Sequence, residues 1–451
     1  MTEGSPWKHI VFFTIPVFLG ALLQQLYNTA DTIIVGQFVD ESSLAAVGTT
    51  NSINFLFLSL AFGFSAGNGI IVSQHYGAKE FEAVRRIASS GILFLLALSL
   101  AATAVGIVFA PKIFHDISAV PNEIFDRTVL YFRCYALGFF FQFGYNILAA
   151  ILRALGDSRA MLYFLLISSI VNVLLDLLFV PVFHWGVFGA ALATDLAQGL
   201  SFAAAIVYMR KYYPIFRYKW NEYVWDKKAV LKTITVGLPI TAQLAIVSLG
   251  LSLIQRAVNE FGEVMTASFT VGHRIEMYLN LPCNSFQIAL ATFTGQNIGA
   301  GKMERVKLGA RQTLFISLVL TILIGICVWI TAPRIISLFG LSPEAASYCA
   351  MHLKTVSFIN VILSLYVPIF GVFQGANHTT FPTMVAGCAL TIRVLTTYLF
   401  RHNSFLGASI IWWNGAFGYS MGCFVTWCFY LSGVWKKNSS IVEQKRESAD
   451  R

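Results

Sequence analysis

The sequence has little charge for its length. Of 451 residues, only 12% are Asp, Glu, Lys or Arg, while 57% are hydrophobic. A soluble domain carries about 25% charged residues. A water-soluble fold of this size cannot bury so much apolar side-chain surface. The composition therefore excludes a soluble enzyme, a disordered chain and a nucleic-acid-binding protein, and it points to an integral membrane protein.

The motifs of ATP-driven and catalytic proteins are also missing. There is no GxxxxGK[ST] loop, so we do not expect ATP to drive the protein directly, and no HExxH or DDxxD-type pattern occurs. None of the seven cysteines forms a CxxC pair. Most of them fall inside apolar runs, which predicts small buried side chains rather than disulfides or metal ligands. We expect no enzymatic activity, no cofactor and no bound metal beyond a coupling Na⁺.

Long apolar runs are what the chain does contain. A membrane-spanning helix needs about 20 mostly apolar residues. Twelve such runs can be placed, at 10–36, 48–74, 87–110, 128–152, 161–183, 187–209, 231–257, 265–293, 309–331, 348–374, 381–400 and 407–435. The predicted fold is therefore all-α, with an N-terminal six-helix lobe (1–209), a cytoplasmic linker (210–230), a C-terminal six-helix lobe (231–435) and a cytoplasmic polar tail (436–451).

Lys and Arg are distributed unevenly between the two sides of this predicted layout. With the N-terminus placed in the cytoplasm, 22 of the 31 Lys and Arg residues fall in cytoplasmic segments and 4 in outside loops. Such an excess is the signature of the cytoplasmic side of a membrane protein. It predicts a multi-pass protein of the plasma (inner) membrane with both termini in the cytoplasm and an even number of spans.

The two halves of the chain resemble each other at an offset of about 222 residues. Ile15-Pro16 corresponds to Leu238-Pro239, and the segment 74–78 (QHYGA) corresponds to 296–300 (QNIGA). Six predicted helices separate the two copies. Because six is an even number, the repeats are parallel rather than inverted. Internal repeats of this kind are typical of secondary transporters, whose binding site lies between the repeats.

Polar side chains recur at helical spacing inside the predicted spans of the first half. They lie three or four residues apart, and so on one helix face each: Gln24, Asn28 and Asp31; Gln142 and Asn146; Asn172 and Asp176; Thr194 and Gln198. Placing a charged side chain at the centre of the bilayer costs about 2.5–3.5 kcal/mol, so a charge there indicates a functional or structural role. Carboxylate, amide and hydroxyl oxygens converging on one pocket would form a site for Na⁺ or for a shared proton. The alternative is that these groups only hydrogen-bond between helices.

Asp195 is harder to interpret. It directly follows Thr194 and must point elsewhere on the helix, so a structural role and a role in the site both remain open.

The second half carries a different set of polar residues. One stripe runs over three turns of the eighth span: Glu276, Asn280, Asn284 and Gln287. The positions that correspond to Asp31 and Asp176 are near Ile254 and Thr397, which cannot titrate, and Asn172 corresponds to Arg393. Coupling is therefore predicted to reside in the first half. Glu276 could bind a cationic substrate, couple a second ion, or pair with Arg393 or Arg274.

Several segments resemble the multidrug and toxic compound extrusion (MATE) family. The similarity covers nearly the whole chain and is carried by the opening run 15–36, by 44–48 (LAAVG), by 152–159 (LRALGDSR) and by 186–194 (GVFGAALAT). In family members, a cation site in the N-terminal lobe uses residues that are matched here by Asp31, Asn146, Asn172, Asp176 and Thr194. Some members also place acidic residues on helices seven and ten, and this sequence has no acid inside either span.

The resemblance implies a V-shaped pair of six-helix lobes. It implies a bacterial antiporter that exports cationic or amphipathic compounds in exchange for H⁺ or Na⁺ by alternating access, as a monomer in contact with membrane lipid. A flippase for a lipid-linked saccharide is the alternative, because Arg256, Arg274 and Arg393 could line a more basic cavity. A membrane prenyl transferase is disfavoured because its carboxylate-rich metal motif is missing.

Overall fold

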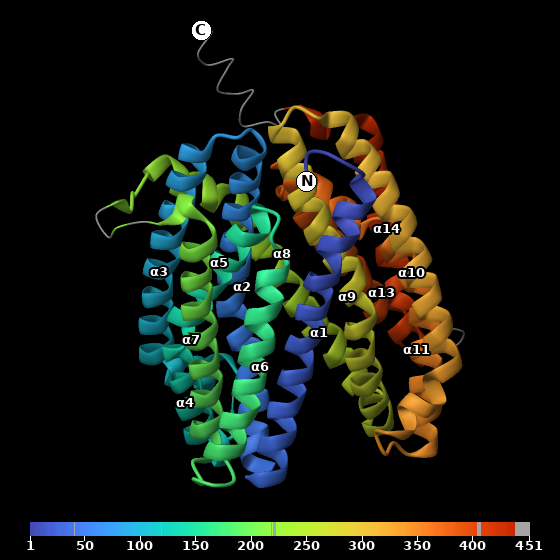
Figure 1. Cartoon of the computed structure of the whole chain (residues 1–451). Helices are drawn as coiled ribbons and strands as arrows, with labels where there is room; N and C mark the ends of the chain where they lie inside the picture. Colours follow the sequence, from blue (N-terminus) through green and yellow to red (C-terminus); the bar gives the residue numbers. More distant parts are fainter. Residues whose placement is uncertain (40, 119, 218, 220–221, 404–406, 438–451) are drawn as a thin grey trace. The chain divides into compact units, whose positions relative to one another are not determined.

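The computed structural model describes the chain except for residues 40, 119, 218, 220–221, 404–406 and 438–451 (Figure 1). The described residues form helices and no strand. The long ones are α1 (Pro6–Phe38), α2 (Glu41–Gly77), α3 (Phe81–Lys112), α4 (Asn122–Leu137), α5 (Phe139–Ala154), α6 (Arg159–Phe179), α7 (Gly186–Tyr212), α8 (Lys227–Asn259), α9 (Glu263–Gly299), α10 (Met303–Ser337), α11 (Pro343–Ser364), α12 (Val367–Gly375), α13 (Thr380–Phe400) and α14 (Ile410–Ser432).

Each of the twelve predicted spans coincides with one of these helices or with a consecutive pair. The pair α4 and α5 forms the fourth span, and the pair α11 and α12 forms the tenth. In the described part of the chain, nine helical segments are long and apolar enough to cross a membrane, or ten with the bent pair α4–α5. The others, α9 and α14, have 37 and 23 residues and are long enough to span. The predicted all-helical, twelve-span fold is confirmed.

The two broken spans have different local causes. At the start of α12, Pro368 supplies no backbone N–H, so the helix restarts there after Tyr366. The α4–α5 pair bends by 44° at Gly138. By contrast, Pro16, Pro239 and Pro282 lie inside the continuous helices α1, α8 and α9.

The chain forms two compact units. One contains Pro16–Thr241, and the other contains Met1–Ile15 together with Ala242–Arg451. The changes of unit therefore fall inside α1 and α8, next to the repeated prolines Pro16 and Pro239. The lobe boundaries predicted at 209/210 and 230/231 stay predictions, and residues 438–451 of the predicted tail lie outside the described part.

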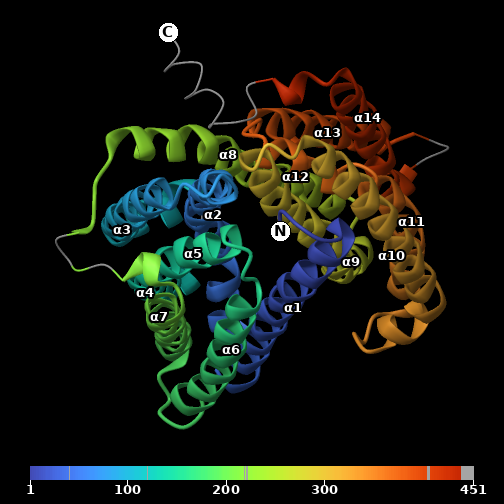
Figure 2. The ribbon, with the colours of Figure 1, turned by 45° about the horizontal axis from the view of Figure 1, so that its top comes forward.

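Small residues set the helix packing inside the unit Pro16–Thr241. A Cβ atom on Gly67 would lie 2.6 Å from the backbone nitrogen of Gly237, so α2 and the start of α8 cross with their backbones in contact. Next to this crossing, Asn68 Nδ2 donates to Thr233 Oγ1 at 3.1 Å. Close crossings of this kind are typical of membrane helices. In the same unit, α5 packs against α2, α3 and α7, and α6 packs against α7 (Figure 2).

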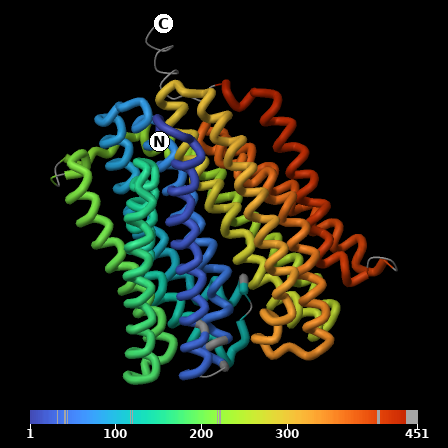
Figure 3. Tube along the Cα trace, turned by 45° about the vertical axis from the view of Figure 1, so that its right-hand side comes forward, coloured from blue at the N-terminus to red at the C-terminus, as the bar shows by residue number. Residues whose placement is uncertain are grey.

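The unit containing Ala242–Arg451 is built in the same manner. A Cβ atom on Gly371 would lie 2.3 Å from the carbonyl oxygen of Gln287, and one on Gly375 would lie 2.5 Å from that of Ala291, so α12 lies directly on α9. The helices α13 and α14 run side by side at the red end of the chain (Figure 3). These contacts hold the helices that carry Glu276 and Arg393.

Candidate functional site

The polar stripes predicted in the first half all lie in the unit Pro16–Thr241. They are carried by α1, α5, α6 and α7, and α7 packs against both α5 and α6. Asn172 Nδ2 on α6 lies 3.4 Å from Thr194 Oγ1 on α7 and donates to it. The hydroxyl of Tyr27 on α1 lies near the side chains of Gln24 and of Gln198 on α7. The structure therefore brings together side chains from α1, α6 and α7.

Asp31 and Asp176 lie close enough to interact electrostatically. The Asp176 side chain is fully buried, and neither of its carboxylate oxygens has a hydrogen-bond partner among the described residues. The Oδ1 atoms of Asp31 and Asn172 are likewise buried without a partner there. Leaving a buried polar group without a partner costs free energy, and a buried carboxylate is tolerated only when a proton or a cation neutralises it. These oxygens form a donor set suited to a hard cation or a proton.

Other predicted members of the site make hydrogen bonds to residues outside the group of Asp31, Asn172, Asp176 and Thr194. Asn146 Nδ2 donates to the carbonyl oxygen of Gln142 at 2.8 Å on its own helix. The Gln142 side chain accepts a hydrogen bond from the hydroxyl of Tyr135 at 3.3 Å. Asn28 is exposed on α1. Within the described part of the chain, Asn146 thus makes no hydrogen bond to the other predicted ligands, and its role stays a prediction.

Asp195 lies against the break between α4 and α5. Its carboxylate packs against Gly138, since a Cβ atom on Gly138 would lie 1.7 Å from Asp195 Oδ1, and this oxygen has no hydrogen-bond partner among the described residues. Gly138 precedes the first residue of α5, so the carboxylate lies at a helix N-terminus, where backbone N–H groups and the helix dipole favour negative charge. The packing against Gly138 is compatible with both alternatives left open by the sequence, so the role of Asp195 stays a prediction.

Two tyrosines of α4 were missed by the sequence analysis. Tyr131 and Tyr135 are four residues apart, and their rings stack with centroids 6.1 Å apart. Tyr131 is buried and Tyr135 half-buried, and both lie near Asp31 and Asp195. Their spacing on one helix face was the available signal. They place aromatic side chains next to the carboxylates of the candidate site.

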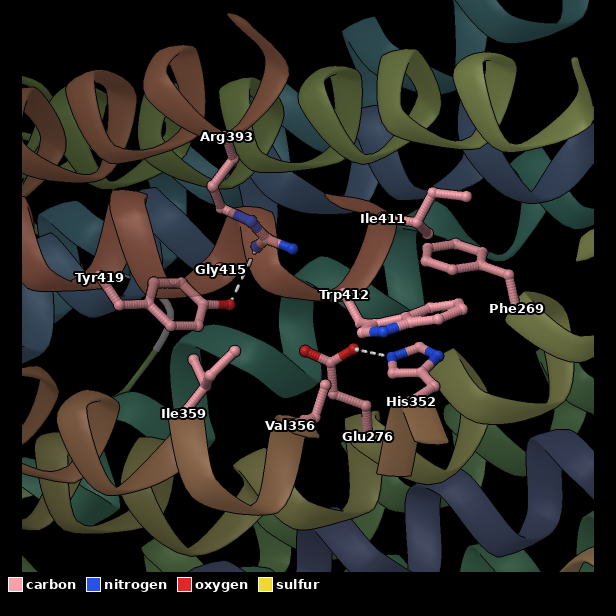
Figure 4. A pocket seen from close by; sticks show the side chains of 10 residues that line it. All are labelled: Phe269, Glu276, His352, Val356, Ile359, Arg393, Ile411, Trp412, Gly415 and Tyr419. Carbon is pink, nitrogen blue, oxygen red and sulfur yellow. Dashed lines mark hydrogen bonds and ion pairs between the residues drawn. The ribbon is translucent and has the colours of Figure 1, made fainter. Parts of the chain in front are cut away.

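The second half contains a separate pocket around Glu276 (Figure 4). Glu276 is 6% exposed, and its Oε2 lies 3.3 Å from His273 Nδ1 and 3.5 Å from His352 Nε2. In the described part of the chain, Glu276 forms no ion pair with Arg393 or Arg274. Its partners are thus two histidines, one from its own helix α9 and one from α11.

Arg393 lies on the opposite side of this pocket (Figure 4). Its Nε donates to Asn414 Oδ1 at 2.8 Å, and its Nη1 donates to the hydroxyl of Tyr419 at 2.9 Å. The guanidinium also lies 5.0 Å from the centroid of the Tyr419 ring. These contacts fix the guanidinium on the α13–α14 pair.

The rest of the predicted stripe on α9 does not line this pocket. Gln287 Nε2 donates to Gln374 Oε1 at 3.1 Å and so connects α9 to the end of α12. Asn284 is exposed, and Asn280 is half-buried with Oδ1 lacking a partner in the described chain. The four residues of the stripe therefore do not form one site.

Comparison with known proteins identifies the family to which this architecture belongs. A family model described as MatE matches residues 16–178 and 239–399, two segments that begin at the repeated prolines and together cover most of the chain. The chain belongs to the MatE family. The family model matches one segment in each half of the chain, which confirms the predicted internal repeat.

Relatives of the MatE protein match it along its whole length. It is 25% identical over 451 residues to the "Probable multidrug resistance protein YpnP" of Bacillus subtilis (strain 168), which covers 98% of this chain and 99% of that protein. It is also 25% identical over 445 residues to the "Probable multidrug resistance protein YoeA" of the same organism, with 97% and 96% covered.

A solved structure described as the outward-facing conformation of a multidrug resistance MATE family transporter of the MOP superfamily has the same fold. The TM-score is 0.91 at 23% sequence identity, covering 97% of this chain and 98% of that one. These findings confirm the resemblance to MATE transporters. The chain is a multi-pass membrane protein of a multidrug efflux family, which is not an enzyme class, and the flippase alternative is not favoured.

Proposed function

We propose that this MatE protein is a secondary antiporter that exports cationic or amphipathic organic compounds in exchange for H⁺ or Na⁺ by alternating access. The observation that carries the proposal is the pair Asp31 and Asp176. Both have buried carboxylate oxygens without a partner in the described structure. A family relationship to multidrug resistance proteins supports small organic molecules as the exported substrates.

The buried pair gives the coupling ion a physical role. Two interacting carboxylates in a low-dielectric interior cannot both stay charged at low cost. A cation or proton bound between them removes that cost, and it does so only in the conformation that brings the oxygens together. A ligand shifts a conformational equilibrium by the difference between its affinities for the two states. Ion binding would thus favour one arrangement of the helices and substrate binding the other.

Asn172 and Thr194 complete the proposed ion site. The bond from Asn172 Nδ2 to Thr194 Oγ1 turns the amide so that Asn172 Oδ1 stays available as a ligand. Carboxylate, amide and hydroxyl oxygens are ligands that a hard cation prefers. A proton needs only the carboxylates. Substitution of Thr194 is therefore expected to affect Na⁺ coupling more than H⁺ coupling.

The proposal includes a location and an assembly state. The excess of Lys and Arg in the predicted cytoplasmic segments supports a plasma (inner) membrane protein with both termini in the cytoplasm. Each of the two units is compact by itself, and we infer that the chain functions as a monomer.

The test is transport by the purified protein in vesicles. Efflux of a fluorescent organic cation such as ethidium is measured with a pH gradient alone and with a Na⁺ gradient alone. We expect one gradient to drive efflux by wild-type protein and Asp31→Asn to abolish that driven component. Asp126→Asn, which changes an exposed carboxylate on α4, is the matched control and keeps it. Normal gradient-driven efflux by Asp31→Asn contradicts the proposal.

A further inference from the structure

We propose that the pocket between Glu276 and Arg393 binds a compact aromatic zwitterion, with its ammonium group at Glu276 and its carboxylate at Arg393. The inference rests on the proposed function in taking the ligand to be an exported small molecule. It adds a substrate class and a second binding site that is separate from the site of Asp31 and Asp176.

The two charges of the pocket are held apart from each other. Glu276 enters from α9 and Arg393 from α13, on opposite sides of the pocket in Figure 4. The carboxylate is fixed by His273 and His352, and the guanidinium by Asn414 and Tyr419. If these residues served only to neutralise each other inside the membrane, a direct ion pair would be the stable arrangement. None joins them in the described structure.

Each charged group keeps hydrogen-bonding capacity on the side of the pocket. The two histidines lie at Oε2 of Glu276, which leaves Oε1 as an acceptor. An arginine carries five N–H donors, and the hydrogen bonds of Arg393 within the described chain use Nε and Nη1 only. A guanidinium with donors to spare favours a planar carboxylate.

A third polar group supports a ligand at this place. The indole of Trp412 lines the pocket and is only 3% exposed, yet its Nε1 has no hydrogen-bond partner among the described residues. A buried indole N–H normally finds an acceptor. A ligand carboxylate held by Arg393 would supply one.

Aromatic rings form one wall of the pocket. The His352 ring stacks on Phe269, with centroids 5.4 Å apart, and on Trp412, with centroids 6.1 Å apart. Tyr419 provides a further ring below the guanidinium of Arg393. Ring faces bind both aromatic groups and ammonium cations. The ligand is therefore expected to carry an aromatic group next to its two charges.

The size of the pocket sets the spacing of those charges. The free space is about 10 Å³, which corresponds to about one water molecule. A gap this small favours a ligand whose ammonium and carboxylate are neighbours, as they are in an α-amino acid. The side chains that line the pocket must move apart to admit these groups and the aromatic ring.

The test is equilibrium binding to the purified full-length chain by calorimetry, with three probes of one skeleton. L-Phenylalanine has both charges, 2-phenylethylamine has the ammonium only, and 3-phenylpropionate has the carboxylate only. A charge-assisted contact is worth about tenfold or more in affinity. We expect L-phenylalanine to bind at least about tenfold more tightly than either analogue.

Two substitutions then assign the contacts. Arg393→Gln is expected to remove the advantage of L-phenylalanine over 2-phenylethylamine, and Glu276→Gln its advantage over 3-phenylpropionate. Arg274→Gln changes an exposed arginine of α9 that does not line the pocket and is the matched control with no effect. Equal affinity for the three probes in the wild-type chain overturns the proposal. So does an equal loss for all three probes in both variants.

A second measurement covers variants that fail to fold. Quenching of Trp412 fluorescence by the three probes, taken as the difference between wild type and Trp412→Phe, reports the same preference for L-phenylalanine. No ion gradient is needed, and Asp31→Asn is expected to keep this binding. Failure of the zwitterion site and failure of ion-coupled export are therefore separate outcomes.

Discussion

The contact between Gly138 and Asp195 yields a stability prediction that can be worked from the structure. Gly138 has φ −74° and ψ −10°, which alanine adopts without strain. The only obstacle to Gly138→Ala is therefore the new methyl group. It would lie 1.7 Å from Asp195 Oδ1 and 2.2 Å from its Cγ, so the buried carboxylate must move by more than 1 Å.

The expected cost follows from this overlap. Adding a methyl group to a filled interior costs about 1–3 kcal/mol, and a displaced buried carboxylate places the value near the upper end. Gly48→Ala in α2 is the matched control, because its Cβ meets nothing within 4 Å. Replacing a helical glycine by alanine there is expected to stabilise by up to about 1 kcal/mol.

The assay is the thermal unfolding midpoint of each purified variant in detergent. We expect Gly138→Ala to melt below wild type and Gly48→Ala at or above it. In the Asp195→Ala background, Gly138→Ala should cost much less, because the colliding atoms are gone. An equal cost in both backgrounds would refute the proposed contact between Gly138 and Asp195.

Three further predictions concern other parts of the unit Pro16–Thr241. Gly67→Val is expected to prevent folding, because its Cβ would press on the Gly237 backbone at 2.6 Å and neither chain segment can yield; expression of monodisperse protein checks this. Thr194→Val removes the acceptor of Asn172 Nδ2, so it should lower the free energy of unfolding by about 1 kcal/mol and weaken Na⁺-driven efflux. Efflux with an unchanged dependence on Na⁺ would count against Thr194 as a ligand. Burial and the negative charge of Asp157 raise the pKa of Tyr213 above its usual value of 10.0. Only the unfolded chain then ionises near pH 10, so folded stability falls as the pH rises above about 10, and Tyr213→Phe should reduce that fall in an alkaline melting series.

Much of the architecture follows from hydropathy and spacing. A spanning helix needs a minimum length of apolar residues, and the spans therefore coincide with helices even where α9 carries Glu276 or where α11 breaks before Pro368. The internal repeat could be recognised from the sequence because Pro16 and Pro239 occupy equivalent positions in the two halves. The change of unit inside α1 and α8 could not be predicted from the sequence. It depends on which helices each part of α1 and α8 packs against, and not on local composition.

The candidate site was predictable only in part. The spacing of Asn172 and Asp176 placed them on one face of α6, and the structure confirms that Asn172 meets Thr194 of α7. Helical spacing says nothing about the partner helix, so it could not show that Glu276 pairs with His352, 76 positions away along the chain. Nor could it show that Asp195 fills the space left by Gly138, because a glycine reveals what it accommodates only in three dimensions.

The central claim is that the buried pair Asp31 and Asp176 binds the coupling ion. Its most direct test is the flux of H⁺ and of Na⁺ caused by adding substrate to vesicles that contain the purified protein and no imposed gradient. The account predicts a substrate-dependent flux of one of these ions in wild type and in Asp126→Asn. It predicts loss of that flux in both Asp31→Asn and Asp176→Asn, each still folded and still binding substrate. An undiminished flux in either of these two variants would contradict it.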